Sequence, residues 1–262
     1  MVNPVLWRDL GKVHTVDTST DDHYDPKVIQ LTNGNVVVAY FTDAPVAGNA
    51  FTGLDIGARI YSSTGELIKD EFRLNFSNTA EDEFDFELAA DDEGGFTVLY
   101  EQRGINGTPS YNIRLDRFYS TGDHAEYNSF LFDGNNTTDG IYFRNPNVTS
   151  LSATQILGTY ERYDENQHTV YIVGKIFNGD TNSASSEFNV DGFYNLGSGT
   201  ETVRGHSSTT LTTGEHVVAI ADGNASTVDA IYVRILNGDG TTTGQPGRIT
   251  VDASHTDAFE PH

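Results

Sequence analysis

The chain has 262 residues, of which 37% are hydrophobic, 26 are glycine and none is cysteine, and its formal net charge is −23. These apolar side chains suffice for a folded core, and the many Gly, Asn, Asp, Ser and Thr residues favour short strands joined by turns. The acidic surface repels nucleic acid and anionic membranes, and the lack of cysteine excludes disulfides and thiolate chemistry. No apolar run is long enough to insert in a bilayer.

Residues 1–21 contain one leading strand and lack the basic, apolar and small-residue order of a secretory signal peptide. The next segment, 22–82, contains four strand-like runs in succession, PKVIQL, NVVVAYF, DIGARIYS and KDEFRLN. Pro26 is expected to begin the first of these strands, and Asn33-Gly34 predicts a type I′ hairpin turn between the first and second. The second run is apolar throughout, as expected for a strand covered on both faces.

The same layout returns in 83–140, 141–201 and 202–257, and the final residues 258–262 resemble the start of a further unit or a ring closure. The second run of each unit ends on a residue that recurs at intervals of 60: Tyr40, Tyr100, Tyr160 and Ile220. The third runs carry a cation at nearly the same period: Arg59, Arg117, Lys175 and Arg234. These two separate sets of residues recur with nearly the same period, which predicts a repeated structural unit.

Four antiparallel strands per unit of this length predict an all-β, β-propeller-like array of four four-stranded blades. One such sheet cannot bury both of its faces alone, whereas sheets that pack face to face can. A pair of tandem β-sandwiches is the alternative, because turn spacing alone does not separate the two folds. The sequence leaves open whether four blades close a ring or form part of a longer array.

The pattern of the first unit resembles repeats of about 60 residues in large secreted bacterial RTX or haemolysin-type calcium-binding proteins and adhesins. The residues that carry this resemblance are Pro26, Val28, Leu31, Gly34, Val37, Val38, Tyr40, Arg59, Tyr61 and Gly65. The chain departs from those repeats in having Tyr where they usually have Trp, and it lacks their glycine-rich nonapeptide calcium motif. The resemblance implies a secreted or cell-surface location, and it implies no particular activity.

Calcium is the cofactor that the sequence suggests, because DGNNTTDG places oxygen ligands close together at Asp133, Asn135 and Asp139. Asp and Asn are also common turn residues without a metal, so a plain turn is the alternative. The four aligned cations could form an anion-binding ring, but with 38 acidic residues in the chain we expect them to pair with carboxylates.

Two acidic residues, Glu101 and Glu161, follow the second strand-like run at equivalent places in two units. Paired acids are what glycoside hydrolysis requires, but no pair in this sequence is distinguished by its surroundings. No nucleophile elbow, phosphate-binding loop or catalytic triad pattern is present, and we assign no catalytic residue.

The sequence therefore favours an extracellular binding or adhesion module that recognises a glycan or a cell-surface partner with the assistance of calcium. Its tyrosine-rich, Asn-rich turns suit sugar stacking and hydrogen bonding. A structural spacer without a ligand and a carbohydrate-active enzyme are the two alternatives.

Overall fold

The structure is a computed structural model that describes residues 23–43, 53–76, 81–104, 110–125, 129–136, 140–152, 154–195, 205–222, 230–241 and 247–250. The expected leading strand in 1–21 and the terminal segment 258–262 lie outside these residues. Among the described residues there is no helix long and apolar enough to cross a membrane.

The first two sheets each contain four antiparallel strands in sequential order. The first is formed by β1 (His23–Gln30), β2 (Val36–Thr42), β3 (Asp55–Tyr61) and β4 (Leu67–Arg73). The second is formed by β5 (Asp82–Ala90), β6 (Phe96–Arg103), β7 (Ser110–Phe118) and β8 (Phe130–Asn136).

The third and fourth sheets repeat this order with one variation. The third is formed by β9 (Ile141–Ser150), β10 (Gln155–Asp164) and β11 (Thr169–Asn178), and the outer edge of β11 pairs with both β12 (Ser183–Ala184) and β13 (Phe188–Asn195). The fourth is formed by β14 (His206–Thr210), β15 (His216–Asp222), β16 (Ala230–Leu236) and β17 (Gly247–Thr250). The third sheet therefore contains five strands, but like the others it is four strands wide, because β12 and β13 share one edge of β11.

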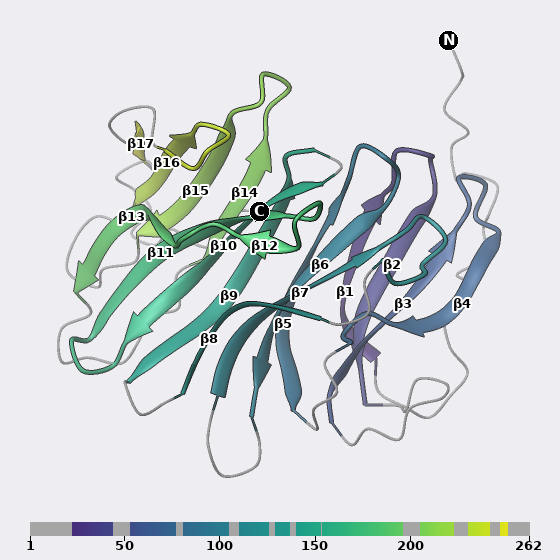
Figure 1. Ribbon diagram of the computed structural model, residues 1–262, viewed down its shortest axis with the longest axis horizontal. Coiled ribbons are helices and arrows are strands. Elements are labelled where there is room, and N and C mark those ends of the chain that lie inside the picture. Colours follow the sequence, from purple (N-terminus) through teal and green to yellow (C-terminus); the bar gives the residue numbers. More distant parts are fainter. Residues whose placement is uncertain are drawn as a thin grey trace.

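The four sheets lie side by side in chain order, with the first and fourth at opposite sides of the molecule (Figure 1). The first strands of neighbouring sheets pack against each other, β1 on β5, β5 on β9 and β9 on β14. They form what we call the inner edge of the array. The predicted propeller-like array of four blades is confirmed, and the sandwich alternative is wrong because the second and third sheets each pack against two neighbours.

Three separate hydrophobic clusters occupy the three spaces between the sheets. Strand β6 shows why the sheets must stack, because Val98 and Tyr100 belong to the cluster facing the first sheet while Leu99 belongs to the cluster facing the third. Adjacent residues of a strand point to opposite faces, so a strand apolar throughout needs cover on both sides. The expectation for the second strand of each unit is confirmed here.

The residues at the 60-residue interval occupy one position of the second strand and are buried, at 3% exposure for Tyr40 and 0% for Tyr100, Tyr160 and Ile220. The hydroxyls of Tyr100 and Tyr160 each donate to a carboxylate. Tyr160 donates to Asp133 at 2.6 Å, and the same carboxylate lies 2.8 Å from the Lys175 ammonium. This arrangement satisfies a hydroxyl that would otherwise be buried without a hydrogen bond.

The predicted pairing of the aligned cations with carboxylates is confirmed for Arg59, Lys175 and Arg234, which lie 2.8–3.2 Å from Asp70, Asp133 and Asp191 respectively. The second sheet differs from the prediction by one residue. Strand pairing places Asp116, rather than Arg117, in the position of these cations, because Arg59, Asp116, Lys175 and Arg234 pair with Val38, Val98, Gly158 and Val218.

The hairpin turn at Asn33-Gly34 is not the type I′ turn that we expected. Only Gly34 has a positive φ, of 88°, and its N–H donates to the Leu31 carbonyl at 2.9 Å. A type I turn followed by a glycine in the left-handed region fits this pattern, since a type I′ turn requires positive φ at both central residues.

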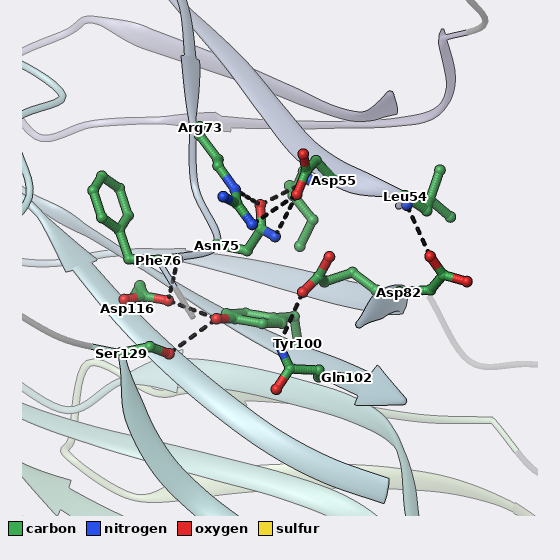
Figure 2. A network of polar contacts seen from close by, with 12 residues as sticks. Leu54, Asp55, Arg73, Asn75, Phe76, Asp82, Tyr100, Gln102, Asp116 and Ser129 are labelled. Atoms are coloured by element: carbon green, nitrogen blue, oxygen red, sulfur yellow. Dashed lines mark hydrogen bonds and ion pairs between the residues drawn. The ribbon is translucent and has the colours of Figure 1, made fainter. Parts of the chain in front are cut away.

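Figure 2 shows a buried polar network that joins the first and second sheets. In the first sheet, the Arg73 guanidinium lies 2.8 Å from Asp55, and Asn75 donates to the same carboxylate at 2.9 Å. In the second sheet, the Tyr100 hydroxyl donates to Asp116 at 2.8 Å and lies 2.9 Å from the Ser129 hydroxyl. These ion pairs and hydrogen bonds allow polar groups to lie between two apolar faces.

The same region holds Glu83, whose side chain is fully buried and accepts a hydrogen bond from Gln102 at 3.1 Å. Burial raises the pKa of Glu83 to about 8, and the hydrogen bond from Gln102 only partly opposes this effect. Because the ordinary pKa is 4.5, the folded chain holds this proton between about pH 5 and 8 while the unfolded chain releases it. This carboxyl therefore makes folding less favourable as pH rises through that range.

Replacing Glu83 with Gln should remove this pH dependence, because Gln resembles the neutral acid. We expect the free energy of unfolding of the Glu83→Gln protein to exceed that of the wild type at pH 8 by at least about 1.4 kcal/mol, the equivalent of one pKa unit, and to differ less at pH 5.5. Urea denaturation at both pH values measures this. Glu93→Gln, at an exposed turn residue, is the control, and a Glu83→Gln protein with the pH dependence of the wild type would contradict the prediction.

Candidate active site at the inner edge

The first strands of the first three sheets share an irregularity in their pairing with the second strands. The register shifts between Tyr24 and Lys27 in β1, between Glu83 and Asp85 in β5, and between Thr159 and Glu161 where β10 pairs with β9. In the fourth sheet β14 pairs with β15 without a shift. Such β-bulges change the direction of side chains and are frequent beside active sites.

At two of these bulges, a residue in the left-handed backbone conformation comes directly before a proline. Asp25 before Pro26 and Asn145 before Pro146 both have a φ of 50°. Pro26 therefore lies within β1 at the bulge, and not at the start of the strand as we expected. Because a non-glycine residue in this conformation is strained, the surrounding sheet must hold it in place.

One lysine and two carboxylates meet at the inner edge just after the first two bulges; we call Lys27, Asp85 and Glu87 the axial acid cluster. The Lys27 ammonium pairs directly with Glu87 and lies 3.8 Å from the Asp85 carboxylate. The side chains of these three residues are 29–36% exposed, so they are within reach of a ligand. Lys27 comes from the first sheet and both acids come from β5 in the second.

The two carboxylates of the cluster differ in their surroundings. Partial burial raises the pKa of Asp85 to about 7; the Lys27 ammonium opposes this rise, while the neighbouring Glu87 and Glu101 carboxylates add to it. Glu87 has the closer contact with the lysine. Asp85 is therefore the acid that keeps a proton near neutral pH, and Glu87 is the one whose negative charge is compensated.

The acids noted in the sequence, Glu101 and Glu161, lie within β6 and β10 and not after them. They are 1% and 0% exposed, and each bonds the Nε atom of an arginine: Glu101 that of Arg103, and Glu161 that of Arg144, at 2.9 Å. Burial raises the pKa of Glu101, while its hydrogen bond from Arg103 and the positive charge there oppose the rise. These two acids hold arginines in place and are too buried to meet a substrate.

The side chains of those two arginines line a cavity of about 300 Å³ between the second and third sheets. We call it the tyrosine pocket, and its lining residues are Arg103, Tyr111, Tyr142, Arg144, Tyr163 and Glu165. Glu101 connects it with the axial acid cluster, because Asp85 and Glu101 are cross-strand partners and so lie on one face of the sheet.

A larger cavity, of about 650 Å³, lies at the opposite end of the first strands and is lined mostly by Ser, Thr and Leu. The hydroxyl groups of three lining residues, Thr149, Ser150 and Thr210, are engaged with each other or with the backbone. Thr149 and Thr210 lie 2.9 Å apart, and the Thr210 hydroxyl also donates to the Ser150 carbonyl at 2.8 Å. Because it contains no cluster of titratable groups, we place the candidate site at the axial acid cluster.

Of the three residues suggested for calcium binding, only Asp133 has a side chain within the described part of the chain. Asp133 lies in β8, where its carboxylate is engaged by Tyr160 and Lys175. Asn135 lies further along the same strand, and Asp139 is outside the described residues. In the part of the chain that is described, no group of three His, Asp or Glu side chains is arranged to hold a metal ion, and calcium binding stays a prediction.

The axial acid cluster was missed because its members belong to different units, although a signal for it exists in the sequence. Lys27 and Glu87 are 60 residues apart, at the same place in two units, and they bond to each other. Asn147 follows at the next interval of 60 and accepts a hydrogen bond from the backbone N–H of Ser208 at 2.8 Å. The polar residue at this place in each unit marks the inner edge.

No family model and no curated protein matches the chain. Among solved structures, an α-L-arabinanase of Penicillium chrysogenum in complex with arabinobiose matches with a TM-score of 0.58 and 12% identity over 89% of this chain and 68% of that one. A GH93 α-L-arabinofuranosidase of Fusarium graminearum matches with a TM-score of 0.56 and 10% identity over 86% of this chain and 65% of that one.

A PL25 ulvan lyase bound to -[GlcA(1-4)Rha3S]- matches with a TM-score of 0.52 and 12% identity over 82% of this chain and 56% of the lyase. The chain thus spans about two thirds of the length of the arabinanase and arabinofuranosidase structures and less of the lyase. At these identities the comparison establishes the fold, which these enzymes share with the chain.

These matches correct the function that we expected from the sequence. The expected adhesion or binding module, with a structural spacer as its alternative, is wrong, because the solved structures that match are carbohydrate-active enzymes. The resemblance to RTX-type repeats and the secreted or cell-surface location stay predictions.

The proximity of Lys27 to Asp85 gives a direct test of the cluster's electrostatics. Replacing Lys27 with Met removes the positive charge that lowers the pKa of Asp85, so this pKa should rise above about 7. Carboxyl-carbon NMR titration of the folded protein measures it. Lys69→Met, which removes the partner of Asp123 in an exposed ion pair, should leave Asp85 unchanged, and an unchanged or lower pKa in Lys27→Met would contradict the assignment.

Proposed function

We propose that the protein is a carbohydrate-active enzyme that hydrolyses a glycosidic bond of a polysaccharide at the axial acid cluster. The observation that carries this proposal is the pair Asp85 and Glu87, two accessible carboxyl groups on one strand with different surroundings. Burial favours the protonated form of Asp85, whereas Glu87 pairs directly with the Lys27 ammonium. Glycoside hydrolysis uses such a pair, in which one group acts as the acid and the other as the base or nucleophile.

The spacing of the two residues suits this chemistry. Asp85, Phe86 and Glu87 pair in unbroken register with Glu101, Tyr100 and Leu99, so Asp85 and Glu87 lie on one face of β5. The Cα atoms of residues two apart on a strand are separated by about 6.5–7 Å. Both carboxylates also contact the Lys27 ammonium, which brings their nearest oxygens closer together than that. Two carboxyl groups this close can flank one glycosidic bond.

The roles follow from the surroundings of each group. Asp85 donates its proton to the glycosidic oxygen as the bond from that oxygen to the anomeric carbon breaks, and the leaving sugar departs as an alcohol. Glu87 accepts a proton from the attacking water, whose oxygen forms the new bond to the anomeric carbon. The reaction adds one water molecule across the bond, and exchange with solvent restores both protonation states.

The matching structures support a glycan as the substrate. Two of them are described in complex with arabinobiose, and the ulvan lyase is described with a bound oligosaccharide. The tyrosine pocket beside the acids adds support, because aromatic side chains with hydrogen-bonding groups are the usual lining of a small-molecule site.

Substituting either acid tests the proposal. We expect Asp85→Asn and Glu87→Gln each to lower kcat at least 100-fold, the lower end of the usual contribution of a general acid or base. Release of reducing ends from a panel that includes arabinan measures this. Asp123→Asn, at an exposed turn carboxylate bonded to Thr121 and Lys69, should retain full activity.

The pH profile of the wild type tests the assignment of Asp85 independently. Activity should fall as pH rises through about 7, because Asp85 then loses the proton that it must donate. Full activity in Asp85→Asn, no cleavage of any polysaccharide in the panel, or formation of an unsaturated sugar that absorbs in the ultraviolet would each contradict hydrolysis at this site.

A further inference from the structure

We infer that the tyrosine pocket is a subsite for an uncharged sugar residue, so that the substrate is a neutral polysaccharide and not a polyanion. This inference rests on the proposed function and names the class of substrate that the same site accepts. The starting observation is that the pocket contains two arginines whose charges are already balanced within the protein.

The walls of the pocket are aromatic and closely packed. The rings of Tyr111 and Tyr142 lie 4.6 Å apart at 78°, and those of Tyr142 and Tyr163 lie 5.8 Å apart at 20°. Tyrosine combines an apolar ring face with a polar tip, which matches the C–H face and the hydroxyl groups of a sugar ring. A volume of about 300 Å³ is at the small end for ligand sites and suits a short stretch of a glycan chain.

The two guanidinium groups are fixed in orientation. Arg103 lies over the rings of Phe84 and Tyr111 at 4.1 and 5.3 Å, and Arg144 lies over the ring of Tyr163 at 5.3 Å. Each is also bonded at Nε by its buried glutamate, as described above. Stacking and the Nε bond together hold planar donor groups at the wall of the pocket, ready to bond sugar hydroxyl oxygens.

The charges around the pocket do not favour an anion. Two guanidinium groups face the carboxylates of Glu101, Glu161 and Glu165, of which Glu165 itself lines the cavity. A carboxylate or sulfate on the substrate would meet no excess positive charge here, and it would approach a chain with a net charge of −23. An uncharged sugar meets neither obstacle.

The Glu165 carboxylate has a further role in the pocket. It accepts a hydrogen bond of 2.5 Å from the Tyr142 hydroxyl, and this bond, with partial burial, raises the pKa of Tyr142 to about 12. The second oxygen of a carboxylate can accept from a sugar hydroxyl while the first holds the tyrosine. The pocket therefore offers both donors and acceptors, as neutral sugars require.

Binding measurements on the Asp85→Asn protein, which should bind without turnover, test the inference. Isothermal titration with arabinotriose and xylotriose as neutral probes and with trigalacturonic acid as the anionic probe should give binding of at least one neutral sugar. We expect any binding of the anionic probe to be at least tenfold weaker.

Substitutions in the same background locate the binding. Tyr142→Ala should weaken binding of the neutral probe at least tenfold through loss of the ring, and Tyr142→Phe should weaken it less. Tyr119→Ala, which removes a 58% exposed tyrosine at the opposite end of β7, should bind as the parent does.

The outcomes separate this inference from the proposed function. Cleavage of an anionic polysaccharide with loss of activity in Asp85→Asn would keep the function and overturn the neutral subsite. Neutral-sugar binding lost in Tyr142→Ala, without cleavage by the wild type, would support the subsite and overturn the function. Binding of neither neutral probe, or equal binding by Tyr142→Ala, would overturn the subsite.

Discussion

The arrangement of this protein depends on the burial of both faces of the second strand in the second and third sheets, β6 and β10. In β6, Val98 and Tyr100 face one neighbouring sheet and Leu99 faces the other. A sheet built on such a strand must lie between two others, since either face left in water would expose a continuous apolar surface. Stacking in this way brings the first strands β1, β5, β9 and β14 together at the inner edge, where polar side chains of separate sheets meet, as those of Lys27 and Glu87 do.

Burial of the tyrosines at the 60-residue interval determines much of the polar structure. A buried hydroxyl needs an acceptor, and a buried acceptor with a negative charge needs a cation. For Tyr160 of the third sheet these are Asp133, from β8 of the second sheet, and Lys175. In the second, Asp116 accepts from Tyr100 and pairs with His124 at 2.7 Å, so the acid has taken the place of the cation on the third strand. The aligned charges are therefore structural.

The candidate site arises where the units differ. The residue after the position that recurs every 60 residues is Phe41 in the first sheet and Ala221 in the fourth, both buried and apolar, whereas it is Glu101 and Glu161 in the second and third. Glu101 and Glu161 can each hold an arginine, which Phe41 and Ala221 cannot do. Among the described residues, the tyrosine pocket therefore forms in the space between the second and third sheets.

The sequence was sufficient to predict the strands and their order, because strand periodicity and a fixed interval depend on local pattern. It favoured stacked sheets but left a pair of tandem β-sandwiches open, and the structure decided between them. The sequence was not sufficient for the site. The bulges at Asp25 and Asn145 shift the pairing register between the first and second strands. The alternation of apolar and polar residues in the sequence does not indicate these shifts. Glu101 and Glu161 were noticed as equivalent acids, but their burial, which decides their role, depends on the neighbouring sheet.

The difference between Asp85 and Glu87 has two causes, burial and a lysine from another sheet. Burial is the largest cause of the raised pKa of Asp85, and the neighbouring Glu87 carboxylate adds to it. The Lys27 ammonium contacts Glu87 directly and lies 3.8 Å from Asp85, so its charge compensates Glu87 more closely. Since β1 reaches β5 only when the first and second sheets stack, the packing of the apolar faces also sets the surroundings on which the proposed roles of the two acids depend.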